Sequence, residues 1–193
     1  MKNELIEYMS QFTELSEEEA QLMIESYPLR TYKKGSVLLK EGQVSKDAFL
    51  VLKGCVRKYC LIDGEEKTTA FFMEGEVAID FESAANHKPS KHYLECVEDS
   101  RIAVINSEKE EAYYKRFPRF EELSRAEAEK MMGSSQEALS SFITSSPEQR
   151  YLDLLQNRPK LLQRVPQHQI ASYIGVTPES LSRIRKRIAK NLH

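Results

Sequence analysis

Between residues 29 and 105, short apolar runs alternate with glycine, and this pattern limits the fold more than any other feature of the sequence. Five of the seven glycines stand here, at positions 35, 42, 54, 64 and 75. The runs are rich in Val, Ile, Leu, Phe and Tyr and cover 37–40, 48–53, 56–62, 67–73 and 101–105. Short strands with a turn about every ten residues are typical of a β-sandwich or barrel. Asp63-Gly64, between two of the runs, predicts a hairpin.

Helical patterns flank this β segment. Residues 3–27 look helical, and Ser16 with Glu19 has the spacing of a capping box. Over 120–143, apolar residues recur imperfectly at steps of three and four. This pattern predicts a long helix that pairs with its copy in a dimer. The alternative is a helix that packs on its own barrel.

The chain after residue 144 has a break and then shorter helical segments. Ser145-Ser146-Pro147 ends the long helix and is typical of a hinge. A short helix is predicted over 148–156, before Pro159. A separate tail then runs from 165 to 192.

Charge is distributed unevenly along the chain. The formal net charge is only −2. From Pro147 onward, however, nine Lys and Arg residues face three acids, so this part is basic and the rest is acidic. Phosphate binding needs local positive charge rather than a net positive charge on the whole protein, so nucleic acid remains a candidate partner.

Composition excludes several other classes of protein. No run of about 18 apolar residues suggests a membrane span, and residues 1–10 do not resemble a signal peptide, so we expect a cytoplasmic protein without a membrane partner. Cys55, Cys60 and Cys96 lack the CxxC spacing of a metal site, and we expect small buried thiols. A redox role for Cys55 and Cys60 is the alternative. No metal site is predicted.

Residues 167–186 match a helix-turn-helix at fixed spacing. The apolar contacts between two short helices would come from Ile170, Ile174, Val176, Leu181 and Ile184. Ala171 is small where the helices would cross, and Gly175 stands at the turn, where a left-handed conformation is needed. Thr177 is the expected N-cap, with Pro178 at the first helical position.

The second of these helices would have one apolar and one polar face. At about 100° per residue, Leu181, Ile184 and Ile188 share a side. The opposite side carries groups that could hydrogen-bond to base edges in a major groove, whereas Arg185, Arg187 and Lys190 are better placed for phosphates. A solvated charged face is the alternative interpretation. The predicted DNA-binding residues are Thr177, Glu179, Ser180, Ser182, Arg183, Lys186, Arg187 and Lys190.

The order of β segment, long helix and helix-turn-helix resembles the Crp/Fnr family of bacterial transcription regulators. In the β segment the resemblance rests on Tyr32-Lys33-Lys34-Gly35, Glu41-Gly42, 49–54, Gly64-Glu65-Glu66 and Gly75-Glu76. In the tail, Glu179, Ser180 and Arg183 match the family's Arg-Glu-Thr/Ser-x-x-Arg pattern, but Pro178 replaces its leading Arg. One base contact of the family would then be missing.

The resemblance implies an α+β fold in three parts. They are a cyclic-nucleotide-binding-like β-roll with flanking helices over 1–118, a dimerisation helix over 119–144 and a helix-turn-helix domain over 147–193. It also implies a homodimer on a palindromic site in double-stranded DNA, with two recognition helices about 34 Å apart. RNA polymerase is a further candidate partner. We expect the state of the β-roll to set the angle of the long helices, and rotation about 145–147 to place the tail domains.

The family's nucleotide binders use Gly-Glu and, a dozen or so residues later, Arg-Ser/Thr. This chain keeps Gly75-Glu76 but has Pro89-Ser90-Lys91-His92 at the later position, and no Arg lies between Gly75 and Arg101. Because a buried phosphate would lack its guanidinium partner, we expect that cyclic-nucleotide binding is lost. Gly75, Glu76, Ser90 and Lys91 are the candidate ligand-binding residues, with an effector of unknown kind.

Two competing functions remain to be compared with the DNA-binding regulator. In one, the chain is a cyclic-nucleotide or other small-ligand module whose C-terminal helices bind a protein. In the other, it is an enzyme. The sequence shows no catalytic triad order, no metal-ligand cluster and no phosphate loop of the GxxxxGK type, so we do not expect an enzyme and name no catalytic residue.

Overall fold

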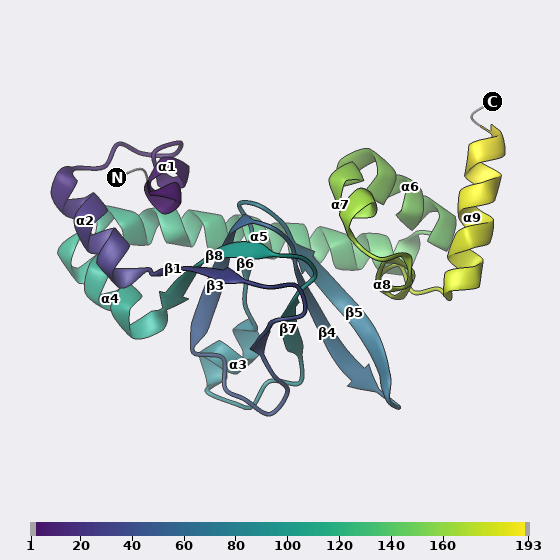
Figure 1. The fold of residues 1–193 in the computed structure, drawn as a ribbon, viewed down its shortest axis with the longest axis horizontal. Coiled ribbons are helices and arrows are strands. Elements are labelled where there is room, and N and C mark those ends of the chain that lie inside the picture. The colour runs from purple at the N-terminus through teal and green to yellow at the C-terminus, as the bar shows by residue number, and fades with distance from the viewer. Residues whose placement is uncertain (1–2, 192–193) are drawn as a thin grey trace. The chain divides into compact units, whose positions relative to one another are not determined.

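The computed structural model describes residues 3–191, and Figure 1 labels its elements. By its internal contacts the chain divides into two compact units. One unit contains the residues up to Leu61 together with Thr69–Ser124, and the other contains Ile62–Thr68 and the residues from Arg125 onward. Among the described residues, no helix has both the length and the apolar character that a membrane crossing requires.

The first unit is built on two four-stranded sheets. Their strands are β1 (Leu29–Tyr32), β2 (Val37–Leu39), β3 (Asp47–Lys53), β4 (Val56–Ile62), β5 (Glu65–Phe72), β6 (Val77–Ala78), β7 (Tyr93–Cys96) and β8 (Ser100–Asn106). One sheet has the order β1-β8-β3-β6 and the other β2-β7-β4-β5, and the pairs with a described register are antiparallel. The predicted β-roll and the α+β class are confirmed.

Alternating side chains of both sheets form the core of the β-roll. Val51, Val56, Leu94 and Ile102 are completely buried there, and nearby Phe49 is almost so. Burying such side chains stabilises the fold by about 1.5–3 kcal/mol each. Cys55 and Cys96 are also buried, and all three cysteines are free thiols.

The predicted hairpin joins β4 to β5. Asp63 and Gly64 form its two-residue turn, with positive φ angles of 54° and 80°. Two successive positive φ angles are characteristic of the turn that suits the twist of paired strands. The sequence did not predict β1, β6 and β7, because β6 has only two residues and β1 and β7, unlike the similarly short β2, interrupt their apolar residues with polar ones.

Helices at both ends of the β segment share a second core. They are α1 (Glu4–Met9), α2 (Glu17–Ser26), α4 (Ser107–Arg116) and the start of α5 (Arg119–Thr144). The predicted capping box is present, because Ser16 and Glu19 exchange side-chain and backbone hydrogen bonds. The region predicted as helical over 3–27 is two helices, with 10–16 outside them. Met23, Tyr113 and Phe120 are buried in this core.

Beyond its first residues, α5 is a long helix with a mostly exposed surface. It spans 26 residues, which confirms the predicted helix over 120–143. Its residues 121–130 are all exposed, and so are most of those that follow. A short helix, α3 (Phe81–Asn86), lies between β6 and β7.

Four helices complete the second unit: α6 (Pro147–Asn157), α7 (Pro159–Arg164), α8 (Gln167–Tyr173) and α9 (Pro178–Asn191). Ser146 caps α6, so only Ser145 and Ser146 separate it from α5. From the sequence, Pro159 was expected only to end α6, and α7 was not predicted. Proline suits the first turn of a helix, and here Pro159 also begins one.

Candidate DNA-binding helices and the cavity of the β-roll

The turn between α8 and α9 has the geometry expected of a helix-turn-helix. Gly175 has a φ angle of +73°, as predicted. The Gly175 amide donates to the Ser172 carbonyl at 3.1 Å, and the Val176 amide donates to the Ala171 carbonyl at 2.9 Å. This pair of hydrogen bonds is a Schellman motif, which ends α8 and redirects the chain.

The apolar positions of the motif form the contact between α8 and α9. Ile170, Ala171 and Ile174 of α8 are buried, and so are Leu181, Ile184 and Ile188 of α9. Val176 is only half-buried. The predicted apolar face of the second helix is therefore confirmed, and it fixes which side of α9 is exposed.

The other side of α9 is exposed. Thr177 Oγ1 accepts a hydrogen bond from the Ser180 amide at 3.3 Å, which is the predicted N-cap contact. Arg183 Nη2 donates to Ser180 Oγ at 3.0 Å, so the hydroxyl holds the guanidinium near the start of the helix. Hydrogen bonds from its own backbone amide and from Thr177 lower the pKa of Glu179 below its usual range, so this carboxylate is ionised.

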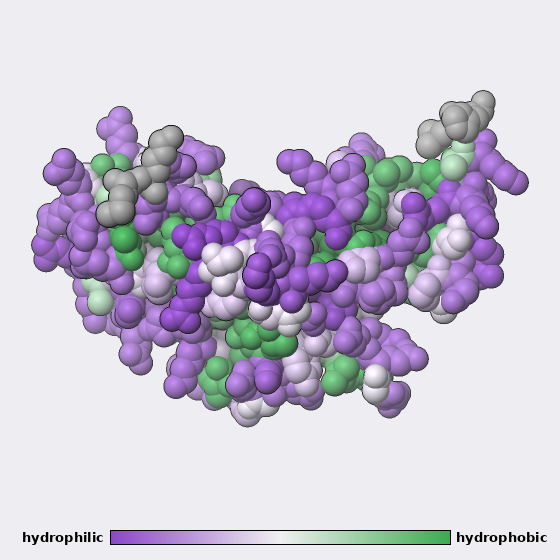
Figure 2. All heavy atoms as spheres, in the orientation of Figure 1, coloured by the Kyte–Doolittle hydropathy of each residue, from purple (hydrophilic) through white to green (hydrophobic). Residues whose placement is uncertain are grey.

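The structure brings the basic side chains of α9 together. Arg183, Lys186, Arg187 and Lys190 line a shallow hollow of about 300 Å³. Ser182 is exposed beside them, whereas Ser180 is half-buried. In the space-filling view, hydrophilic residues cover the outer edge of α9 (Figure 2).

One of these arginines already has an acidic partner. Arg187 Nε donates to Glu148 Oε1 at 3.0 Å, and Arg187 Nη2 bonds to the other carboxylate oxygen. Glu148 lies in the first turn of α6, 39 residues away in the sequence. Nothing in the local sequence pattern links the two positions, so this pair could not be predicted from the sequence.

Arg150 of α6 joins three chain segments of this unit. Its Nη1 donates to the carbonyls of Phe142 at 2.9 Å and of Ser145 at 2.6 Å. Its Nε donates to the Ile174 carbonyl at 3.0 Å, and its guanidinium lies 4.4 Å from the centre of the Phe142 ring. One side chain therefore satisfies carbonyls at the C-terminal ends of α5 and α8.

In the β-roll, the structure separates the candidate ligand residues into two groups. Ser90 and Lys91 line a cavity of about 180 Å³, and Gly75 and Glu76 do not. Glu76 Oε2 instead accepts a hydrogen bond from the Met73 amide at 2.6 Å, closing the turn before β6. The other lining residues are Asp80, Glu82, Ser83, Lys88 and Pro89.

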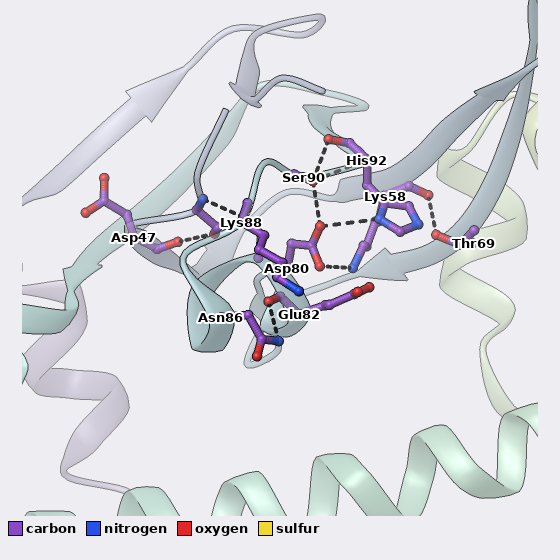
Figure 3. Close-up of polar contacts among 11 residues, drawn as sticks. Asp47, Lys58, Thr69, Asp80, Glu82, Asn86, Lys88, Ser90 and His92 are labelled. Carbon is purple, nitrogen blue, oxygen red and sulfur yellow. Dashed lines mark hydrogen bonds and ion pairs between the residues drawn. The ribbon is translucent and has the colours of Figure 1, made fainter. Parts of the chain in front are cut away.

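A buried carboxylate lies at this cavity. Asp80 Oδ1 pairs with Lys58 Nζ at 3.2 Å, while Oδ2 accepts from Ser90 Oγ at 2.5 Å and lies 3.3 Å from His92 Nδ1 (Figure 3). The Asp80 side chain is only 4% exposed. The sequence analysis did not single out Asp80 or Lys58, because their roles depend on contacts between separate elements.

The surroundings of Asp80 keep it charged. Burial acts to raise its pKa, but the hydrogen bond from Ser90 and the charge of Lys58 outweigh burial and lower the pKa below its usual range. Within the described part of the chain, no three His, Cys, Asp or Glu side chains are grouped so that they could hold a metal ion.

The β-roll matches a known family of domains. Residues 29–117 match the family model of the cyclic nucleotide-binding domain. No match was found among curated proteins.

Several solved structures match nearly the whole chain. CooA from Carboxydothermus hydrogenoformans has a TM-score of 0.67 at 18% identity, covering 96% of this chain and 84% of its own. The c-di-GMP-responsive global regulator CLP of Xanthomonas campestris has a TM-score of 0.70 at 16% identity, with 91% and 93% covered. A Eubacterium rectale protein described as a transcriptional regulator of the Crp/Fnr family has a TM-score of 0.67 at 16% identity, with 92% and 85% covered.

The chain has the fold of a Crp/Fnr regulator. The expected resemblance is thus confirmed at the level of architecture: β-roll, long helix and C-terminal helix-turn-helix. Two of these structures, CLP and the Eubacterium rectale protein, are described as regulators. A shared fold does not by itself identify an effector for this chain.

Proposed function

We propose that this protein is a DNA-binding transcription regulator and that α9 enters the major groove. The observation that carries the proposal is the exposed basic face of α9, positioned by a complete Schellman turn after α8. Arg183 and Glu179 would contact base edges, since arginine can bind guanine bidentately and glutamate can accept from cytosine. Ser182 and Lys186 share that face. Arg187 and Lys190 would contact phosphates, and Thr177 and Ser180 would support the start of the helix.

We also propose a homodimer held by α5. Met132, Leu139 and Ile143 are 62%, 62% and 73% exposed. Steps of seven and four residues place all three within one narrow stripe of the helix. An apolar stripe on a helix that is exposed over most of its length favours pairing with a second copy of the helix, in the manner of a coiled coil. A two-fold dimer would then read a palindromic site.

In this proposal the β-roll does not hold a cyclic nucleotide. Its cavity of about 180 Å³ is smaller than the roughly 300–1,000 Å³ of ordinary ligand pockets. No arginine lies between Gly75 and Arg101, and the buried carboxylate of Asp80 lines the cavity. A cyclic phosphate would meet repulsion from Asp80 rather than a guanidinium.

Selection of bound sequences from random DNA tests the proposal. We expect a palindromic consensus with half-sites about one helical turn apart, and a complex of two chains per site. Titration of the bound complex with cyclic AMP and cyclic GMP should leave the affinity unchanged. Failure to enrich any sequence would contradict the DNA-binding role. A response to either nucleotide would support the alternative, a nucleotide-binding module.

Removal of Arg187 should weaken DNA binding by the same factor on selected and on random DNA. A phosphate contact carries no sequence information, and its loss should reduce the slope of log K against log salt by about one. Fluorescence anisotropy at several KCl concentrations measures both quantities for Arg187→Ala.

The matched variant for that measurement is Glu148→Gln. It releases Arg187 from its ion pair, so we expect tighter binding to both kinds of DNA. A loss confined to the selected site in Arg187→Ala would contradict the phosphate role. Unchanged affinity in Glu148→Gln would show that the ion pair does not compete with DNA.

A further inference from the structure

We propose that Asp80 is an internal anion, which fills an oxyanion site of the β-roll and thereby excludes external carboxylates and phosphates from it. The groups around Asp80 are those that would bind a free oxyanion: an ammonium, a hydroxyl and an imidazole. Charge-assisted hydrogen bonds of this kind are the strong ones in proteins.

The donors come from separate parts of the unit and converge on one carboxylate. Asp80 immediately precedes α3, Lys58 belongs to β4, and Ser90 and His92 lie in the segment before β7. Ser90 is itself buried, and its Oγ also accepts a hydrogen bond from the His92 amide at 2.9 Å. The His92 carbonyl, 3.0 Å from Ser90 Oγ, is a second acceptor, so contacts with the His92 backbone hold the hydroxyl beside Asp80.

The carboxylate lies at the wall of an existing space. Asp80 and Ser90 both line the cavity of about 180 Å³. If Asp80 were replaced by alanine, the space left by its carboxylate would become part of this cavity. The Ser90 hydroxyl would then lie at the edge of the enlarged space. The remaining Lys58 charge would be only 17% exposed and without its carboxylate. A small anion from solution would then have both room and partners.

The same contacts account for the proposed exclusion of external anions. With Asp80 in place, a second anion would lie beside a buried negative charge whose hydrogen-bond donors are already engaged. The other charged side chains of the cavity wall are Glu82, Lys88 and Lys91, so the exclusion is assigned to Asp80 and its engaged donors and not to the wall as a whole. The inference deepens the proposal that the β-roll lacks a cyclic nucleotide. It can fail on its own, because its test uses neither nucleotide nor DNA.

The test is chemical rescue of Asp80→Ala with sodium formate, with sodium chloride at equal ionic strength as the reference. In chloride we expect the melting temperature of the variant to fall by at least about 5 °C, since a buried charge loses its partner. Formate should raise the melting temperature of the variant saturably over millimolar concentrations. It should raise that of the unmodified protein by no more than chloride does.

Two further variants sharpen the comparison. Asp80→Asn keeps the site filled with a neutral group of the same shape and should gain nothing from formate. Asp99→Ala removes an exposed carboxylate that pairs with Lys33 at 2.8 Å, and it also should gain nothing. If Asp80→Ala does not fold in chloride, formate should restore refolding. A variant whose stability and refolding respond to formate no more than the unmodified protein would overturn the inference.

Discussion

Replacement of Arg183 by alanine is expected to weaken binding to the selected palindrome by about 1–3 kcal/mol, roughly 5- to 150-fold, and to relax the preference at one base pair of each half-site. The guanidinium lies on the exposed face of α9, next to Ser180, in the first half of the helix that would enter the groove. Competition between selected and random DNA at one fixed salt concentration measures the change.

The controls for Arg183 separate base recognition from charge and from folding. Arg183→Lys retains the charge but cannot bind guanine bidentately, so it should lose sequence preference while retaining part of the affinity. The free energy of unfolding should change by less than about 0.5 kcal/mol in either variant, because the side chain is exposed. Equal losses on selected and random DNA would show that Arg183 contacts only phosphates.

Replacement of Arg150 by methionine is expected to lower the free energy of unfolding of the C-terminal unit by about 2–3 kcal/mol. Methionine keeps the aliphatic stem but leaves the carbonyls of Phe142, Ser145 and Ile174 without their shared donor. The stacking of the guanidinium on Phe142 is lost as well. Calorimetry of the full chain measures the change in stability.

The controls for Arg150 use a conservative change and a surface arginine. Arg150→Lys keeps the charge, but one ammonium cannot make all the hydrogen bonds of the guanidinium. Its free energy of unfolding should therefore lie between those of Arg150→Met and the unmodified protein. Arg185→Met, on exposed α9, should change stability by less than about 0.5 kcal/mol. An Arg150→Met protein as stable as the unmodified one would show that the three hydrogen bonds contribute nothing.

Arg150 also alters the expectation for the hinge at 145–147. The break between α5 and α6 is present, but Arg150 bridges it by bonding to Phe142 before the break and to Ile174 after it. We therefore expect the helix-turn-helix to move together with the end of α5 rather than to rotate about the two serines. Faster hydrogen exchange of the amides at 145, 146, 148 and 149 in Arg150→Met would support this coupling.

Local signals predicted the parts of the fold that local chemistry determines. Asp63-Gly64 predicted its hairpin because only a few residue types accept two positive φ angles in succession. Gly175, Leu181 and Ile184 predicted the helix-turn-helix because the contacts between α8 and α9 join residues that are close in sequence. The same holds for Ser16 and Glu19, whose capping bonds span three residues.

Short strands and long-range polar contacts could not be predicted from the sequence, because both depend on contacts between segments that lie far apart in the chain. β1 is defined by pairing with β8, about 70 residues away, and β6 by only two residues paired with β3. Neither strand has enough length for a hydrophobic period to appear. The hydrogen bond from the Met73 amide to the Glu76 carboxylate is likewise a contact that the Gly-Glu motif does not predict.

By itself, the sequence determined the order of β segment, long helix and helix-turn-helix, and the basic side of the last helix. These depend on turn residues and on apolar spacing, which act over a few positions. Only the tertiary structure decided that Asp80 meets Lys58, Ser90 and His92, that Arg150 bridges the helix ends, and that Glu148 neutralises Arg187. Such contacts arise when packing brings distant segments together, and the energy of a buried charge depends on every neighbour that packing supplies.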